Sequence, residues 1–153
     1  MATFRFEKLL KLRETERNDA KNAFLEAESR RRDAQSRLEE IERELIAERD
    51  EARRTREMGA LDATALQSRQ RFRDQLLEKR NVAEETLAAL TSEAEEKRAK
   101  LNDAIKEVKI LENLKDKTLE RELEDAKRKD DKATDDLTNQ LESIERQRVA
   151  KEE

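Results

Sequence analysis

The chain has 153 residues, which is long enough for one globular domain, but its composition excludes a compact one. Charged residues make up 48% of the sequence, against roughly a quarter in ordinary domains. There is no His, Cys, Trp or Tyr, and there is a single Gly. The sequence therefore offers no disulfide, no thiolate or imidazole catalyst, no Zn-type site and no glycine-rich phosphate loop. We expect a protein that is not an enzyme and that has no metal site and no cofactor.

The balance of charges limits the partners. The 35 basic and 39 acidic residues give a net charge of -4 and are finely mixed, with many Glu residues four positions before a basic one, as in Glu26 and Arg30. This pattern favours helices over disorder. A negative net charge with no aromatic residue except four Phe argues against nucleic-acid binding. No apolar run approaches the roughly 20 residues of a membrane span, and no signal peptide precedes the first helix, so we expect no transmembrane segment and a cytoplasmic location.

Two long helices are predicted in chain order. One Gly and no Pro leave Gly59 as the only strong helix breaker. The first helix is expected at residues 4–56 and the second at residues 65–144, followed by a tail at 145–153. Strands are excluded by the same bias toward Ala, Glu, Lys, Leu and Arg, and the whole chain, residues 1–153, is expected to form one domain.

The connection between the helices is expected at residues 58–63. Thr64 with Gln67 three residues later fits a capping box, in which each side chain accepts a hydrogen bond from the backbone of the other. The second helix is therefore predicted to start at this pair.

Apolar residues in both predicted helices alternate at spacings of four and three, the seam pattern of a coiled coil. The first seam comprises Leu10, Arg13, Arg17, Ala20, Phe24, Ala27, Arg31, Ala34, Leu38, Ile41 and Leu45. The second comprises Leu76, Arg80, Ala83, Leu87, Leu90, Ala94, Lys97, Leu101, Ala104, Val108 and Leu111. Antiparallel helices should pair residues whose numbers have a constant sum, and a sum of 121 pairs Leu38 with Ala83 and Leu45 with Leu76. The expected fold is all-α: a long antiparallel two-helix coiled-coil hairpin with an overhanging C-terminal helix.

The overhang begins at Glu120, where the second helix extends past the first. Its apolar stripe has no expected intramolecular partner and comprises Leu123, Ala126, Ala133, Leu137, Leu141 and Ile144. A frayed helix end is the alternative.

Residues 53–80 have eight basic and four acidic residues, a net of +4, whereas residues 120–145 have five basic and ten acidic residues, a net of -5. In the 121 register Glu48 is expected to meet Arg73.

Three segments carry a family resemblance. Residues 4–6 and 9–14 combine an aromatic and Leu-rich opening with a Leu-Arg-Glu sequence. Residues 110–117 read Ile-Leu-Glu-Asn-Leu-Lys-Asp-Lys, and residues 127–132 and 135–137 form a tail rich in Lys, Arg and Asp. Together they resemble the flagellar export protein FliJ family and its relatives in virulence type III secretion.

This resemblance implies a central stalk similar in shape to the γ subunit of rotary ATP synthases. The paired helix ends would enter the pore of a hexameric export ATPase, and the rest of the hairpin would reach the membrane export gate protein and handle substrate chaperones. The implied location is cytoplasmic, peripheral at the cytoplasmic face of the inner membrane.

Two groups of residues are candidate partner-binding sites. The ATPase-ring candidates are the apolar residues near the paired helix ends, Phe4, Phe6, Leu9, Leu12, Leu114, Leu119 and Leu123. The export-gate candidates are Arg69, Phe72, Arg73, Leu76 and Leu77. The alternatives are that the first group only closes the seam and that Phe72 packs against the first helix near Glu48 and Ala52. Adjacent carboxylates such as Asp130 and Asp131 point about 100° apart on a helix and are expected to be solvated rather than metal ligands.

The leading hypothesis is a binding protein that stimulates the export ATPase and links it to the gate. An asymmetric protein inside an ATPase ring can bias the catalytic cycle of the ring only by binding some conformations of the ring subunits more tightly than others. The alternatives are a generic structural coiled-coil scaffold and a small helical-hairpin holdase chaperone.

Overall fold

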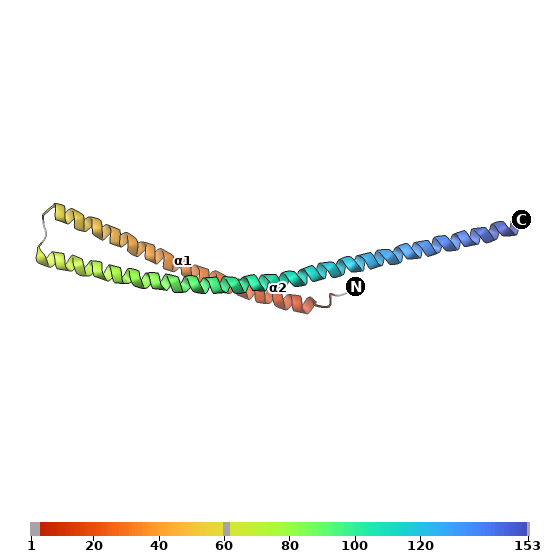
Figure 1. Ribbon diagram of the computed structural model, residues 1–153, viewed down its shortest axis with the longest axis horizontal. Coiled ribbons are helices and arrows are strands. Elements are labelled where there is room, and N and C mark those ends of the chain that lie inside the picture. Colours follow the sequence, from red (N-terminus) through yellow and green to blue (C-terminus); the bar gives the residue numbers. More distant parts are fainter. Residues whose placement is uncertain (1–3, 60–61, 153) are drawn as a thin grey trace. The chain divides into compact units, whose positions relative to one another are not determined.

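The computed structural model contains two long α-helices (Figure 1). α1 spans Glu7–Glu57 and α2 spans Ala63–Glu152. The structure describes residues 4–59 and 62–152, and no strand occurs among them. The helices pack against each other, so the predicted all-α helical hairpin is confirmed. Residues 60–61 of the predicted connection and residue 153 of the predicted tail lie outside the described residues, as do residues 1–3, whereas the predicted first helix is described in full.

The ends of α1 differ slightly from the prediction. α1 begins at Glu7 rather than at Phe4, because a turn precedes it in which the Glu7 N–H donates to the Phe4 carbonyl at 3.1 Å. At the other end the Gly59 N–H donates to the Arg56 carbonyl at 3.2 Å, and Gly59 has a φ of 66°. This left-handed conformation is accessible to glycine because it lacks a Cβ, which explains why the helix ends here.

The predicted start of α2 is wrong by two residues. α2 begins at Ala63, and its cap is Asp62, whose Oδ1 accepts a hydrogen bond from the Ala65 N–H at 2.6 Å. Thr64 therefore lies within the first turn and cannot form the predicted capping box with Gln67. Asp and Thr are both good capping residues, and here Asp62 takes the position that satisfies the free N–H groups.

α2 also continues beyond Ile144 to Glu152, so residues 145–152 of the predicted tail are helical. Neither Gly nor Pro occurs in this segment to end the helix. An ion pair of Arg148 with Glu152 at 3.8 Å follows the favourable spacing of four residues.

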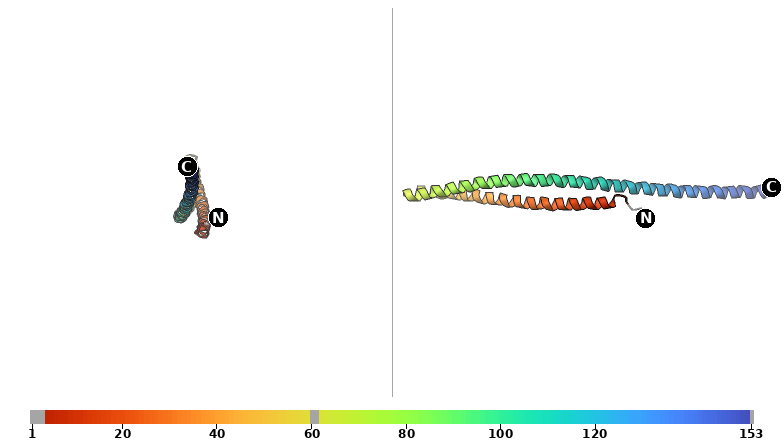
Figure 2. Two further views of the ribbon diagram at one scale, coloured as in Figure 1. Left: turned by 90° about the vertical axis from the view of Figure 1, so that its right-hand side faces the viewer. Right: turned by 90° about the horizontal axis from the view of Figure 1, so that it is seen from below.

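The chain divides into two compact units, residues 13–106 and residues 1–12 with 107–153. In the first unit α1 and α2 run antiparallel and side by side (Figure 2). Its apolar cluster contains Leu38, Ile41 and Ala83, with Leu45 and Leu87 packed against them. Every seam residue predicted from the spacing is buried or half-buried, including the basic ones.

Ion pairs between the helices agree with the predicted register to within about one turn. Arg30 pairs with Glu93 at 3.6 Å, and Arg69 lies 3.7 Å from Glu48 and 3.6 Å from Glu51. The predicted partner of Glu48 was Arg73, so this prediction is wrong by one turn. Arg69 lies near two carboxylates of α1, those of Glu48 and Glu51, and is attracted by both. A pair of Arg73 with Glu48 alone would provide only one such attraction.

Within α1 a bidentate pair joins Arg31 to Glu28, with distances of 2.6 and 3.1 Å. Arg31 occupies a seam position, and its guanidinium turns back toward Glu28 on the same helix. The hydrogen bonds from Arg31 lower the pKa of Glu28 below its ordinary value of 4.5, desolvation opposes this change, and the charges of Arg31 and Arg32 reinforce it. The same hydrogen bonds raise the pKa of Arg31.

A pH dependence follows from this pair. Because folding lowers the pKa of Glu28, its contribution to stability is present above about pH 4.5 and is lost as the pH falls below that value. Glu28→Gln should therefore lower the thermal midpoint at pH 7, and the difference from the unmodified chain should shrink toward zero in acid. Glu26→Gln is the control, since Glu26 meets Arg30 only at 3.9 Å and is more exposed. An equal difference at all pH values would contradict the prediction.

Candidate partner-binding surfaces

The seven residues predicted to meet the ATPase ring all belong to one compact unit, that of residues 1–12 with 107–153. We call this group the terminal surface. Its two aromatic residues lie in the turn before α1, Leu9 and Leu12 lie near the start of α1, and Leu114, Leu119 and Leu123 lie in the middle part of α2. Phe4 is half-buried. The other six residues are exposed: Phe6, Leu9, Leu12, Leu114, Leu119 and Leu123.

Three contacts lie in or beside the terminal surface. The rings of Phe4 and Phe6 meet edge to face, with centroids 5.9 Å apart and an interplanar angle of 70°, and the Arg5 guanidinium lies 5.6 Å from the Phe6 centroid. Lys115 Nζ of α2 lies 3.0 Å from a carboxylate oxygen of Glu7 in α1. This ion pair joins the two helices at positions next to Phe6 and Leu114 in the sequence.

The core of this unit does not use the terminal surface. Leu10 and Val108 are the buried residues that close the seam in this unit. The outward position of six of the seven candidates therefore argues against the alternative that they only close the seam. A cluster of exposed apolar side chains that includes an aromatic pair is typical of a protein-binding site.

The unit also contains the long C-terminal part of α2. α1 contributes only Glu7–Leu12 here, and every described residue of α2 from Glu120 onward is exposed. The predicted apolar stripe is therefore present, with Leu137, Leu141 and Ile144 all exposed.

The five export-gate candidates do not form one surface. Leu76 is only 1% exposed and belongs to the core, so the prediction that it contacts a partner is wrong. It occupies a seam position, and because its side chain is buried between the two helices, a partner protein has no exposed surface of Leu76 to bind. Arg69 is half-buried and is engaged by α1 through Glu48 and Glu51.

Phe72, Arg73 and Leu77 remain as candidates on this side. Phe72 is 48% exposed and Arg73 is exposed, whereas Leu77 is half-buried. The exposure of Phe72 favours an accessible anchor over the alternative in which it packs against α1. Its contact with a gate protein remains a prediction.

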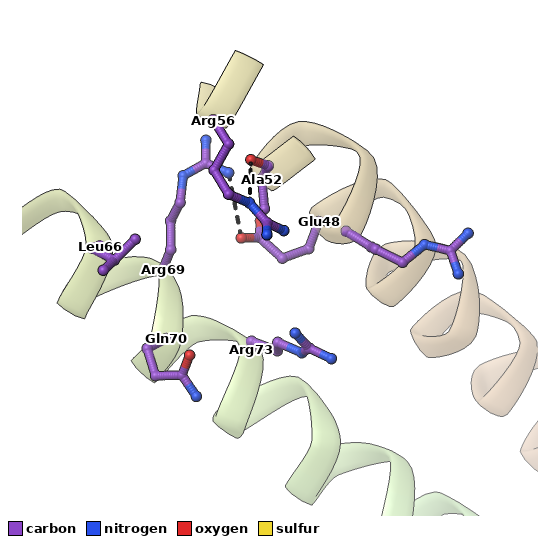
Figure 3. A pocket seen from close by; sticks show the side chains of 8 residues that line it. Glu48, Ala52, Arg56, Leu66, Arg69, Gln70 and Arg73 are labelled. Atoms are coloured by element: carbon purple, nitrogen blue, oxygen red, sulfur yellow. Dashed lines mark hydrogen bonds and ion pairs between the residues drawn. The ribbon is translucent and has the colours of Figure 1, made fainter. Parts of the chain in front are cut away.

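A polar pocket between α1 and α2 was not predicted. It has a volume of about 280 Å³ and lies within the unit of residues 13–106 (Figure 3). Its lining residues are Glu48, Arg49, Ala52, Arg56, Leu66, Arg69, Gln70 and Arg73. The one feature of the sequence that indicates this pocket is the loss of paired apolar seam residues after Leu45 in α1 and before Leu76 in α2.

No group of three or more Asp or Glu side chains in residues 4–59 and 62–152 is arranged to hold a metal ion. Over the same part of the chain, neither helix has a stretch that is long and apolar enough to cross a bilayer.

Comparison with known proteins gives one family. The family model described as flagellar FliJ protein matches residues 1–147, which is nearly the whole chain. Comparisons with curated proteins and with solved structures gave no significant match.

Proposed function

The chain belongs to the flagellar FliJ family, and from this premise we propose that it is a central stalk that binds and stimulates a hexameric export ATPase. Membership indicates a role in flagellar protein export as a component rather than an enzyme. The proposal adds that the chain links the ATPase to the membrane export gate and handles substrate chaperones. It would act in the cytoplasm, at the cytoplasmic face of the inner membrane.

The terminal surface is the observation that supports this proposal. Six of its seven residues are exposed on one compact unit, and Phe4 and Phe6 form an aromatic pair within it. A binding protein of this kind needs no catalytic group, because it can change the rate of a partner enzyme by contacting one conformation of a ring subunit more favourably than another. On the other unit Phe72, Arg73 and Leu77 are proposed to contact the gate.

The test is ATP turnover by the purified partner ATPase with and without the purified chain. We expect stimulation that saturates at one chain per ATPase hexamer, because a single central stalk occupies one pore. Stimulation is the outcome that a passive scaffold cannot produce. Open-ended self-assembly without stimulation would instead favour the scaffold, and suppressed aggregation of unrelated proteins would favour the holdase.

A further inference from the structure

The seam changes character near the connection between the helices. Leu45 and Leu76 are the last apolar residues that the 121 register pairs on this side. Beyond them the seam positions of α1 are Glu48, Ala52 and Thr55, and those of α2 are Arg73, Arg69 and Leu66. A seam without paired apolar residues cannot close, which explains the pocket of about 280 Å³ at this place. Polar residues at core positions are a departure from good packing, and such departures are expected at functional sites.

The pocket carries an excess of positive charge. Arg49 and Arg56 line it from α1, Arg69 and Arg73 line it from α2, and Glu48 is the one acidic residue in the lining. Figure 3 shows the guanidinium group of Arg69 directed at Glu48 and the Nε of Arg56 directed at the Ala52 carbonyl. Four guanidinium groups and one carboxylate give the lining a net charge of +3. Glu51 and Asp50, just outside it, lie 3.6 Å from Arg69 and 3.9 Å from Arg49, so a smaller positive excess remains for an anion to neutralise.

Hydrogen-bond donors in the pocket are incompletely used. Arg69 reaches Glu48 and Glu51 only at 3.7 and 3.6 Å, and its Nη1 atom is shielded from solvent without a hydrogen-bond partner. The Nε of Arg56 donates only to the Ala52 carbonyl, at 3.5 Å. A shielded guanidinium N–H without a partner is costly, and a bound oxyanion would accept its hydrogen bond.

We propose that this pocket binds a phosphate group. The planar fork of a guanidinium matches two phosphate oxygens, and Arg residues from both helices can contact different oxygens of the same group. The phosphate can come from free inorganic phosphate or from the headgroup of an anionic lipid. Leu66 in the lining and Met58 just after α1 are exposed apolar residues, Met58 to 80%, and apolar and basic residues together are a feature of proteins that meet anionic membranes.

The test uses the purified chain alone, so its result does not depend on the ATPase or the gate. One arm measures binding of inorganic phosphate by calorimetry, with chloride at the same ionic strength as the reference. A second arm measures co-sedimentation with vesicles of phosphatidylglycerol and phosphatidylcholine, with vesicles of phosphatidylcholine alone as the reference. Binding in the first arm alone assigns free phosphate, and binding in the second arm alone or in both arms assigns the lipid headgroup.

The variant Arg56→Gln with Arg73→Gln should weaken whichever binding is seen by tenfold or more. Arg53→Gln with Arg54→Gln is the matched control, because it also removes two positive charges near the connection between the helices, but from residues that are paired with Glu57 and Glu51 and lie outside the pocket lining. We expect the control to bind within about twofold of the unmodified chain.

A second variant keeps the test decisive if the double Arg variant loses helicity. Gln70→Glu adds a carboxylate to the pocket lining without removing any Arg, and it should also reduce binding by tenfold or more. Absence of binding in both arms would overturn the proposal. Equal losses in the pocket variant and the Arg53 and Arg54 control would also overturn it, because they would show general attraction between charges.

Discussion

Leu38→Asp should lower the thermal midpoint of the helices far more than Leu137→Asp, although both changes replace Leu by Asp inside a long helix. Leu38 is 8% exposed and packs with Ile41 and Ala83, whereas Leu137 is 61% exposed. Loss of a buried Leu side chain alone costs about 2–5 kcal/mol, and a carboxylate left in the seam adds a desolvation penalty. At Leu137 only the lower helix propensity of Asp counts, at about 0.5 kcal/mol.

The loss at Leu38 would be a large share of the roughly 5–15 kcal/mol that stabilises a folded domain. Circular dichroism of helicity during heating measures both variants under the same conditions, and the identical substitution in Leu137→Asp controls for helix propensity. Similar midpoints for the two variants would contradict the description of the core. A large loss at Leu137 alone would show that the exposed part of α2 packs against another chain in solution.

The helical seam could be predicted from the sequence because spacing decides which residues share a helix face. A side chain that recurs at every third and fourth position stays on one face, whatever its polarity. For this reason the spacing correctly predicts that Arg31 belongs to the same seam as Leu38 and that Lys97 belongs to the same seam as Ala83. The single Gly likewise identified the end of α1, because Gly59 has a positive φ.

Finer details depend on distances that spacing does not give. Asp62 and Thr64 are both suitable caps, and only the backbone geometry shows that Asp62 accepts the hydrogen bond. The same reason applies to Glu48, since the register defines a facing position but not which long Arg side chain reaches it. Leu76 belongs to the apolar seam, which already indicates burial, whereas its nearness to Phe72 in the sequence does not show that the two share a surface.

The pocket was missed because it arises from what the seam lacks. Patterns of apolar residues indicate where helices touch, and a stretch such as Glu48, Ala52 and Thr55 gives no positive signal. Only the structure shows that the Arg side chains of both helices line one opening there. The exposure of Leu9 and Leu12 could be predicted, because the seam has no position for them, whereas the place of Phe4 and Phe6 before α1 could not.

The variant Phe4→Ala with Phe6→Ala should abolish stimulation of the partner ATPase at concentrations where the unmodified chain saturates it. A few buried aromatic anchors usually carry most of the free energy of an interface, and loss of one costs about 2 kcal/mol or more. Such a loss corresponds to about a 30-fold higher Kd for one residue, and the variant removes two, so the Kd should rise well above the concentrations at which the unmodified chain saturates the ATPase. Both residues precede the first residue of α1, Glu7, so the buried Leu10 and Val108 should remain in place.

The measurement is ATP turnover by the purified ATPase over a range of concentrations of each variant, with helicity confirmed by circular dichroism. Phe72→Ala is the matched control, because it also removes an exposed Phe ring but in the unit of residues 13–106. It should leave stimulation unchanged and reduce binding to the gate protein. Leu119→Ala with Leu123→Ala should weaken stimulation in the same way as the double Phe variant, since those residues belong to the same terminal surface. Two outcomes would contradict the prediction: full stimulation by both terminal variants, or loss of stimulation in Phe72→Ala alone. Loss in Phe72→Ala alone would show that the ATPase binds the other unit, because removing the surface that contacts the ATPase must abolish the stimulation.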